Sequence, residues 1–130
     1  MVTQPKLLLI GENEDYLYAL SEKLTSQSYA VKVANDGRVA VAATEEINPD
    51  LIILDLDFTR AMDEGFKTCM ILRAITDCPM IVLSENDDEL EKIKYLNLCA
   101  DRFIEKPCDD RLLFAIVRSV IRLWFHHNGP

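Results

Sequence analysis

Three short, uninterrupted apolar runs constrain the fold of this chain more than any other feature of its sequence. They cover residues 7–10, 51–54 and 80–83, and polar residues bound each of them. Runs of this length without polar alternation are typical of parallel strands buried on both faces of a sheet. Two weaker runs, 30–34 and 101–105, complete a set of five predicted strands.

Segments with the spacing of amphipathic helices lie between these strands and after the last one. Their apolar residues recur three or four positions apart, as Leu90, Ile93 and Leu96 do. Most of the predicted helices follow a residue that can accept hydrogen bonds from the free amides of the first turn. These capping residues are Asn13, Asp36, Asn86 and Asp109. Strands alternating with helices predict an α/β domain whose open parallel sheet carries helices on both faces.

The length and charge of the chain limit what kind of protein it is. Its 130 residues fit one domain, which we place at residues 1–125, followed by a disordered tail at 126–130. A net charge of -8, with no cluster of Lys and Arg, argues against direct binding of nucleic acid or of an anionic membrane. No apolar run approaches the roughly 20 residues of a membrane span. A basic partner or a divalent cation suits this acidity better.

The cysteines indicate the compartment. They show neither a CxxC pair nor the close spacing of a zinc site, and no signal peptide precedes the first strand. We therefore expect buried, reduced thiols in a cytoplasmic protein. The residues are Cys69, Cys78, Cys99 and Cys108.

Polar residues gather where the predicted strands end, which is where open α/β sheets bind ligands. Glu12 follows the first strand, Asp55 ends the third, Ser84 ends the fourth, and Lys106 follows the fifth. If the strand order is 2-1-3-4-5, strands one and three are neighbours, and Glu12 and Asp55 converge. Two carboxylates at close range repel each other, and a hard divalent cation such as Mg²⁺ relieves the repulsion.

The remaining two groups point to phosphoryl transfer. Lys106 adds a fixed positive charge and Ser84 a hydroxyl, which together can hold an anionic oxygen beside the metal. A carboxylate, a cation, an ammonium and a hydroxyl around one point are the parts needed to transfer a phosphoryl group to Asp55. The plain alternative is an aspartate that only caps the next loop, and the matching positions of Glu12 and Lys106 count against it.

The order and spacing of these pieces resemble the response-regulator receiver domains of two-component signalling. The resemblance runs through LLLIGENED, LIILDLD, IVLSENDD and FIEKP, and so covers nearly the whole chain. It implies a flavodoxin-like three-layer fold, with a five-stranded parallel sheet in the order 2-1-3-4-5 and five helices. It also implies a histidine kinase as partner, Mg²⁺ as cofactor, and at most weak autophosphatase activity.

The same resemblance implies a role for each residue of the site. Asp55 accepts the phosphoryl group, and Mg²⁺ binds the carboxylates of Glu12 and Asp55 and the backbone carbonyl of Asp57. Lys106 bridges to the phosphoryl oxygens, and Ser84 turns its hydroxyl towards them.

Two further features follow from the resemblance. Phe103 matches the switch aromatic of the family, which moves inward when the hydroxyl residue is drawn to the phosphoryl group. The bond between Lys106 and Pro107 is cis in the family, and a cis X-Pro bond is otherwise uncommon.

The run DDELEKIKYLNLCADRFIEKP resembles the branch whose receivers precede a winged-helix DNA-binding domain. Receivers of that branch form homodimers through the fourth helix, fifth strand and fifth helix. Asp101, Arg118 and Arg122 retain charges of that interface, whereas Leu112 and Ile116 stand where charged residues commonly form salt bridges across the dimer. We expect a more hydrophobic homodimer. A stand-alone receiver and a piece of a longer regulator with a DNA-binding domain both fit the sequence.

Departures from the family pattern keep two alternatives open. Gly11 replaces the first of two adjacent acids, Glu12 replaces the more common aspartate, and Glu85 stands where a small residue follows the hydroxyl. The changes at Gly11 and Glu12 predict weaker binding of Mg²⁺, and Glu85 is expected to crowd or repel an incoming phosphoryl group. One alternative is a degenerate receiver that acts as a phosphorylation-independent protein-interaction module. The other is a flavin-binding flavodoxin-like protein, which the acidic loop GENED disfavours because it would repel phosphate.

Overall fold

The computed structural model describes residues 4–56 and 62–128, in which strands and helices alternate throughout. The strands lie close to the predicted positions, and the last helix continues three residues beyond its predicted end at about residue 125. The elements in chain order are β1 (Lys6–Ile10), α1 (Glu14–Ser26), β2 (Ala30–Ala34), α2 (Gly37–Ile47), β3 (Leu51–Leu56), α3 (Met62–Ile75), β4 (Met80–Ser84), α4 (Glu89–Leu98), β5 (Arg102–Glu105) and α5 (Asp110–Asn128).

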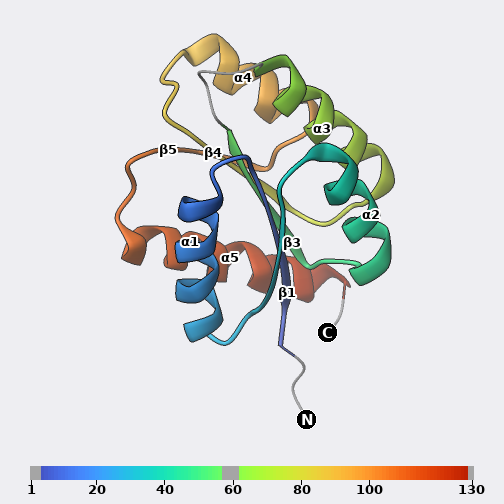
Figure 1. The fold of residues 1–130 in the computed structure, drawn as a ribbon, viewed down its shortest axis with the longest axis vertical. Coiled ribbons are helices and arrows are strands. Elements are labelled where there is room, and N and C mark those ends of the chain that lie inside the picture. The colour runs from blue at the N-terminus through green and yellow to red at the C-terminus, as the bar shows by residue number, and fades with distance from the viewer. Residues whose placement is uncertain (1–3, 57–61, 129–130) are drawn as a thin grey trace.

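The five strands form one sheet with the order β2-β1-β3-β4-β5, and every neighbouring pair is parallel. This confirms the predicted order. In register, Ile10 of β1 pairs with Leu54 of β3, and Asp55 pairs with Leu83 of β4. The carboxyl ends of β1, β3 and β4 therefore meet at one edge of the sheet (Figure 1).

Two hydrophobic cores, one on each face of the sheet, explain the uninterrupted apolar runs. Helices α1 and α5 cover one face, and α2, α3 and α4 cover the other (Figure 1). Side chains of one strand alternate between the faces, so Leu54 and Leu56 join the core under α2, α3 and α4, whereas Ile53 joins the core under α1 and α5. The side chains of a central strand that is covered on both faces do not contact water, so apolar residues are favoured along the whole strand.

Three of the four predicted capping residues are confirmed. The side chains of Asn13, Asp36 and Asp109 each accept a hydrogen bond from a backbone amide in the first turn of α1, α2 and α5. The prediction for α4 is wrong, because Asp88 caps that helix. Asn86 instead accepts a hydrogen bond from the amide of Asp88 at 2.9 Å and closes a turn just before the helix.

Helix α4 exposes most of its apolar residues instead of burying them. Leu90, Ile93 and Leu96 are 76%, 48% and 45% exposed, and the buried residue of this helix is Tyr95. Leu112 and Leu123 of α5 are also more than half exposed. Because β5 is the edge strand between α4 and α5, apolar side chains lie exposed on both sides of that edge.

The four cysteines are free thiols, and most of them are buried. Cys69, Cys78 and Cys99 are buried as predicted, whereas Cys108 is only partly buried. Burial raises the pKa of the Cys78 thiol to about 11.

Across residues 4–56 and 62–128, no helix is both long enough and apolar enough to span a bilayer.

Candidate functional site

Asp55 lies near the end of β3 with its side chain buried, at 5% exposure. Because Leu54 and Leu56 face the opposite core, the alternation of a strand directs Asp55 to the face covered by α1 and α5. A buried carboxylate is costly unless a hydrogen bond or a positive charge compensates it. Asp55 therefore needs a partner on that face.

Lys106 is that partner. Its ammonium forms an ion pair with the Asp55 carboxylate, and the lysine side chain is only 15% exposed. The backbone amide of Lys106 donates to the carbonyl of Ser84 at 2.8 Å, which fixes the lysine to the end of β4. The bond between Lys106 and Pro107 is cis, as predicted. The structure thus brings together Asp55 of β3 and Lys106 of the loop after β5, two predicted site residues whose strands are not neighbours.

Tyr16, in the first turn of α1, is a part of this site that the sequence analysis missed. The Lys106 Nζ atom lies 4.3 Å from the centre of the Tyr16 ring. Burial, with a smaller contribution from the charge of Asp55, raises the pKa of Tyr16 to about 12, so its phenol is neutral at physiological pH. The signal available in the sequence was an aromatic residue three positions after the cap Asn13, in the first turn of the helix that follows the site loop.

Ser84 ends β4 and is almost fully buried, at 1% exposure. Its Oγ atom accepts a hydrogen bond from the amide of Asn86 at 3.0 Å, which uses one lone pair of the hydroxyl. Glu85, the next residue, is exposed. The buried hydroxyl and the exposed carboxylate therefore stand side by side at the edge of the sheet.

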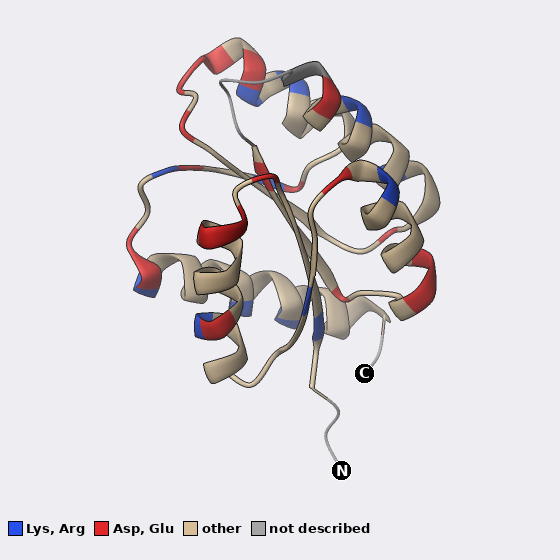
Figure 2. Ribbon diagram, viewed as in Figure 1, with Lys and Arg blue, Asp and Glu red and all other residues tan. Residues whose placement is uncertain are grey.

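Glu12 lies exposed in the loop after β1, beside the end of β3 that carries Asp55. Acidic segments gather at this edge of the sheet in Figure 2. Within the described residues, no group of three or more His, Cys, Asp or Glu side chains is placed to hold a metal ion. Asp57, predicted to offer a backbone carbonyl, lies outside the described residues. The ends of β1 and β3 carry two carboxylates, Glu12 and Asp55, and one or two carboxylates with several waters is the usual donor set for Mg²⁺.

The backbone at Gly11 lies so close to Asp55 that it leaves little room for a side chain at position 11. A Cβ atom at position 11 would lie 3.1 Å from both the Cβ and the carbonyl oxygen of Asp55, and 3.2 Å from Cδ1 of Leu17. These separations are shorter than ordinary carbon contacts. A larger residue here requires β1, β3 or α1 to shift slightly.

Gly11→Asp is expected to bind Mg²⁺ about tenfold more tightly, because it adds a carboxylate to the site. It should also lose about 1 kcal/mol of unfolding free energy through overpacking against Asp55 and Leu17. Isothermal titration calorimetry with MgCl₂ measures the Mg²⁺ affinity, and urea denaturation measures the free energy of unfolding. Gly11→Ala is the matched control, since it adds the Cβ without the charge. Equal Mg²⁺ affinity in Gly11→Asp and Gly11→Ala would contradict the prediction.

Phe103, the predicted switch aromatic, lies half-buried on β5. Its ring centre is 5.8 Å from that of Tyr95 on α4, and the Tyr95 ring in turn meets Phe66 of α3 edge to face at 5.3 Å. Phe103 is therefore the outer member of an aromatic row that links β5, α4 and α3.

The predicted interface residues differ in their exposure to solvent and in their contacts within the domain. Leu112, Arg118 and Arg122 are exposed on α5, whereas Ile116 is half-buried against the core under α1 and α5. Asp101 already has partners within the domain: its carboxylate accepts a hydrogen bond from the amide of Met80 at 2.8 Å and pairs with Arg73 at 3.2 Å. Any contact of Asp101 across a dimer would have to share that carboxylate.

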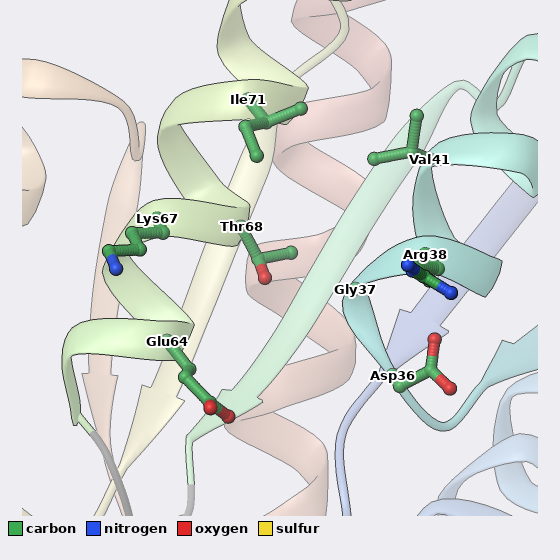
Figure 3. A pocket seen from close by; sticks show the side chains of 8 residues that line it. All are labelled: Asp36, Gly37, Arg38, Val41, Glu64, Lys67, Thr68 and Ile71. Atoms are coloured by element: carbon green, nitrogen blue, oxygen red, sulfur yellow. The ribbon is translucent and has the colours of Figure 1, made fainter.

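A groove of about 690 Å³ lies between α2 and α3, on the face of the sheet opposite to the Asp55 side chain. Val41 and Ile71 point into it from the two helices (Figure 3). Gly37 lets the helices approach closely, because a Cβ there would lie 2.8 Å from Oγ1 of Thr68. None of the predicted site residues that the structure describes lines this groove, so among those residues it is separate from the edge that carries Asp55.

Comparison with known proteins supplies a family for this arrangement. Residues 7–118 match the family described as response regulator receiver domain. The sensory transduction protein BceR of Bacillus subtilis is 30% identical over 123 residues, which are 95% of this chain and 52% of that protein. The transcriptional regulatory protein AfsQ1 of Streptomyces coelicolor is 33% identical over 118 residues, 91% of this chain and 52% of that protein.

The chain thus spans about half the length of these curated relatives. A CheY-like receiver domain from Methanospirillum hungatei has the same fold, with a TM-score of 0.88 over 97% of this chain and all of the other, at 17% identity. The relatives named as transcriptional regulators agree with the branch predicted from the sequence.

Proposed function

This chain belongs to the response-regulator receiver family of two-component signalling, and we propose that its Asp55 accepts a phosphoryl group from a histidine kinase. One observation carries the proposal: a buried carboxylate ends a central strand and holds a lysine ammonium at the ligand-binding edge of the sheet. A carboxylate placed only to cap a loop has no need of burial beside a lysine from the loop after another strand.

The chemical step follows from the groups present. An oxygen of Asp55 attacks the phosphorus of the phosphorylated histidine, the phosphorus–nitrogen bond breaks, and the histidine nitrogen leaves with the electron pair and takes a proton from solvent. Lys106 stabilises the negative charge of the phosphoryl oxygens in the transition state. The buried Ser84 hydroxyl donates to one of those oxygens once the group is attached.

Glu12 and Asp55 would hold Mg²⁺, which supplies positive charge that offsets the repulsion between the carboxylate and the incoming phosphoryl group. Because Gly11 contributes no third carboxylate, we expect a Mg²⁺ affinity lower than a site with another acid would have.

Labelling with a small phosphodonor tests the proposed function directly. The wild-type protein, incubated with phosphoramidate and MgCl₂, should gain the mass of one phosphoryl group by intact mass spectrometry. The same reaction in EDTA should give no gain. An ordinary receiver domain labelled in parallel controls for the donor. An unlabelled wild type beside a labelled control would favour the phosphorylation-independent interaction module instead.

We further propose that phosphorylation changes the surface formed by α4, β5 and α5, through Ser84 and Phe103, and that two copies of the domain associate there. Leu90, Ile93 and Leu112 expose apolar side chains on this surface. Burying such side chains against a second copy removes them from water, which favours association. The apolar residues at positions 112 and 116 replace charges that would otherwise need partners.

Leu112→Glu is expected to weaken self-association of the phosphorylated domain by at least about tenfold, because it places one unpaired carboxylate per copy in an apolar contact. Sedimentation velocity over a range of concentrations measures the change. Ile71→Glu is the matched control, since Ile71 is 50% exposed on α3, away from this surface. A wild-type domain that stays monomeric at high concentration, both with and without phosphoramidate, would contradict the proposed homodimer.

A further inference from the structure

Tyr16 stands beside the phosphorylation site without belonging to any motif of the sequence. Lys106 lies between this ring and the carboxylate of Asp55: its Nζ atom is 4.3 Å from the ring centre and is paired with Asp55. An ammonium within about 6 Å of an aromatic ring centre is attracted by the negative face of the ring, and more strongly where water is partly excluded. The lysine side chain is 15% exposed, so this attraction acts in a largely dry environment.

The position of the ring is fixed from two directions. The amide of Tyr16 donates to the side chain of Asn13 at 3.1 Å, which anchors the first turn of α1. The ring also packs against the core under α1 and α5. The phenol stays neutral at physiological pH. The ring therefore offers Lys106 a fixed and uncharged aromatic face that does not compete with Asp55 as a second anion.

We propose that Tyr16 is a positioning residue for phosphoryl transfer: its ring holds the Lys106 ammonium over Asp55, where the transferred oxygens arrive. This inference rests on the proposed phosphorylation of Asp55. Lysine has a long side chain with several rotatable bonds, and a second contact reduces the number of conformations it samples. A pre-positioned ammonium needs less reorganisation as negative charge develops on the phosphoryl oxygens.

The test compares an aromatic with an aliphatic replacement. Tyr16→Leu removes the ring and should slow labelling by phosphoramidate and MgCl₂ about fivefold. Tyr16→Phe keeps the ring and loses only the hydroxyl, so it should label within about twofold of the wild type. Tyr18→Leu is the matched control on the same helix, because Tyr18 is 67% exposed, and it should label at the wild-type rate. Tyr16→Met replaces Tyr16→Leu if the latter has a lowered melting temperature.

A second measurement does not depend on phosphorylation. Ring currents of Tyr16 should shift the ε-methylene protons of Lys106 upfield in the NMR spectrum, with the signal assigned by Lys106→Arg. Tyr16→Leu should abolish that shift, whereas Tyr16→Phe and Tyr18→Leu should keep it. This signature is independent of whether Asp55 accepts a phosphoryl group.

The outcomes distinguish the positioning role of Tyr16 from the proposed phosphorylation of Asp55. Slow labelling of Tyr16→Leu that Tyr16→Phe rescues, together with loss of the upfield shift, supports the positioning role. Equal labelling of wild type and Tyr16→Leu overturns it, as does a Tyr16→Phe that labels as slowly as Tyr16→Leu. An unlabelled wild type overturns the proposed function. The NMR comparison then decides alone whether the ring holds Lys106, and an unshifted signal in the wild type rejects that contact.

Discussion

Asp55→Asn is expected to reduce labelling by phosphoramidate and MgCl₂ from complete to undetectable. The amide of asparagine has no charged oxygen to attack phosphorus, and no other carboxylate in the described residues is buried beside a lysine at the edge of the sheet. Asn keeps the shape of Asp and leaves the Lys106 ammonium a hydrogen-bond acceptor, so the fold should persist. Intact mass spectrometry measures the effect.

Asp87→Asn is the matched control for that experiment. Asp87 is exposed in the loop after β4, near the same edge of the sheet, and it lies outside the pair formed by Asp55 and Lys106. It should label as the wild type does. A phosphoryl adduct that persists in Asp55→Asn would place the modified residue elsewhere, and peptide mapping of that adduct would identify it.

Tyr95→Ala is expected to lower the free energy of unfolding by about 3–5 kcal/mol, the range for removing a large aromatic side chain from a core. Tyr95 is fully buried and its ring meets those of Phe66 and Phe103, so its removal leaves a cavity between α3, α4 and β5. Urea denaturation followed by circular dichroism measures the change.

Tyr18→Ala provides the comparison, since Tyr18 is 67% exposed and its truncation should change the free energy of unfolding by no more than about 0.5 kcal/mol. A cost below about 1 kcal/mol for Tyr95→Ala would mean that the surroundings collapse onto the cavity. That result would remove Tyr95 as the packing link between α4 and the edge strand.

The sheet could be predicted because its central strands are buried on both faces. Continuous apolar runs located β1, β3 and β4, and the polar residues that end those runs located the site. Asp55 and Lys106, which are far apart in the sequence, meet because parallel strands end at the same edge. This part of the site depends on the topology of the sheet, which the alternation of strands and helices along the sequence predicts.

Other features depended on contacts that no periodic pattern records. Asn86 and Asp88 are both good capping residues, and only the backbone of the preceding turn decides that Asp88 caps α4. The apolar residues of α4 have helical spacing, but that spacing does not tell which face meets the sheet when Tyr95 fills the contact. The ring of Tyr16 reaches Lys106 only through the folded arrangement of α1 and the loop after β5.

The alternation of side chains along β3 has a consequence for how a signal would travel. Asp55 faces the core under α1 and α5, whereas Tyr95 and the inner side of Phe103 belong to the core under α2, α3 and α4. Asp55 and the aromatic row of Phe103, Tyr95 and Phe66 therefore lie on opposite faces of the sheet, so any coupling between them has to pass through the sheet or around its rim. The hydrogen bond from the Lys106 amide to the Ser84 carbonyl lies on that rim and joins the last residue of β4 to the loop after β5. Through this hydrogen bond the lysine that pairs with Asp55 is also tied to β4, next to the edge strand that carries Phe103.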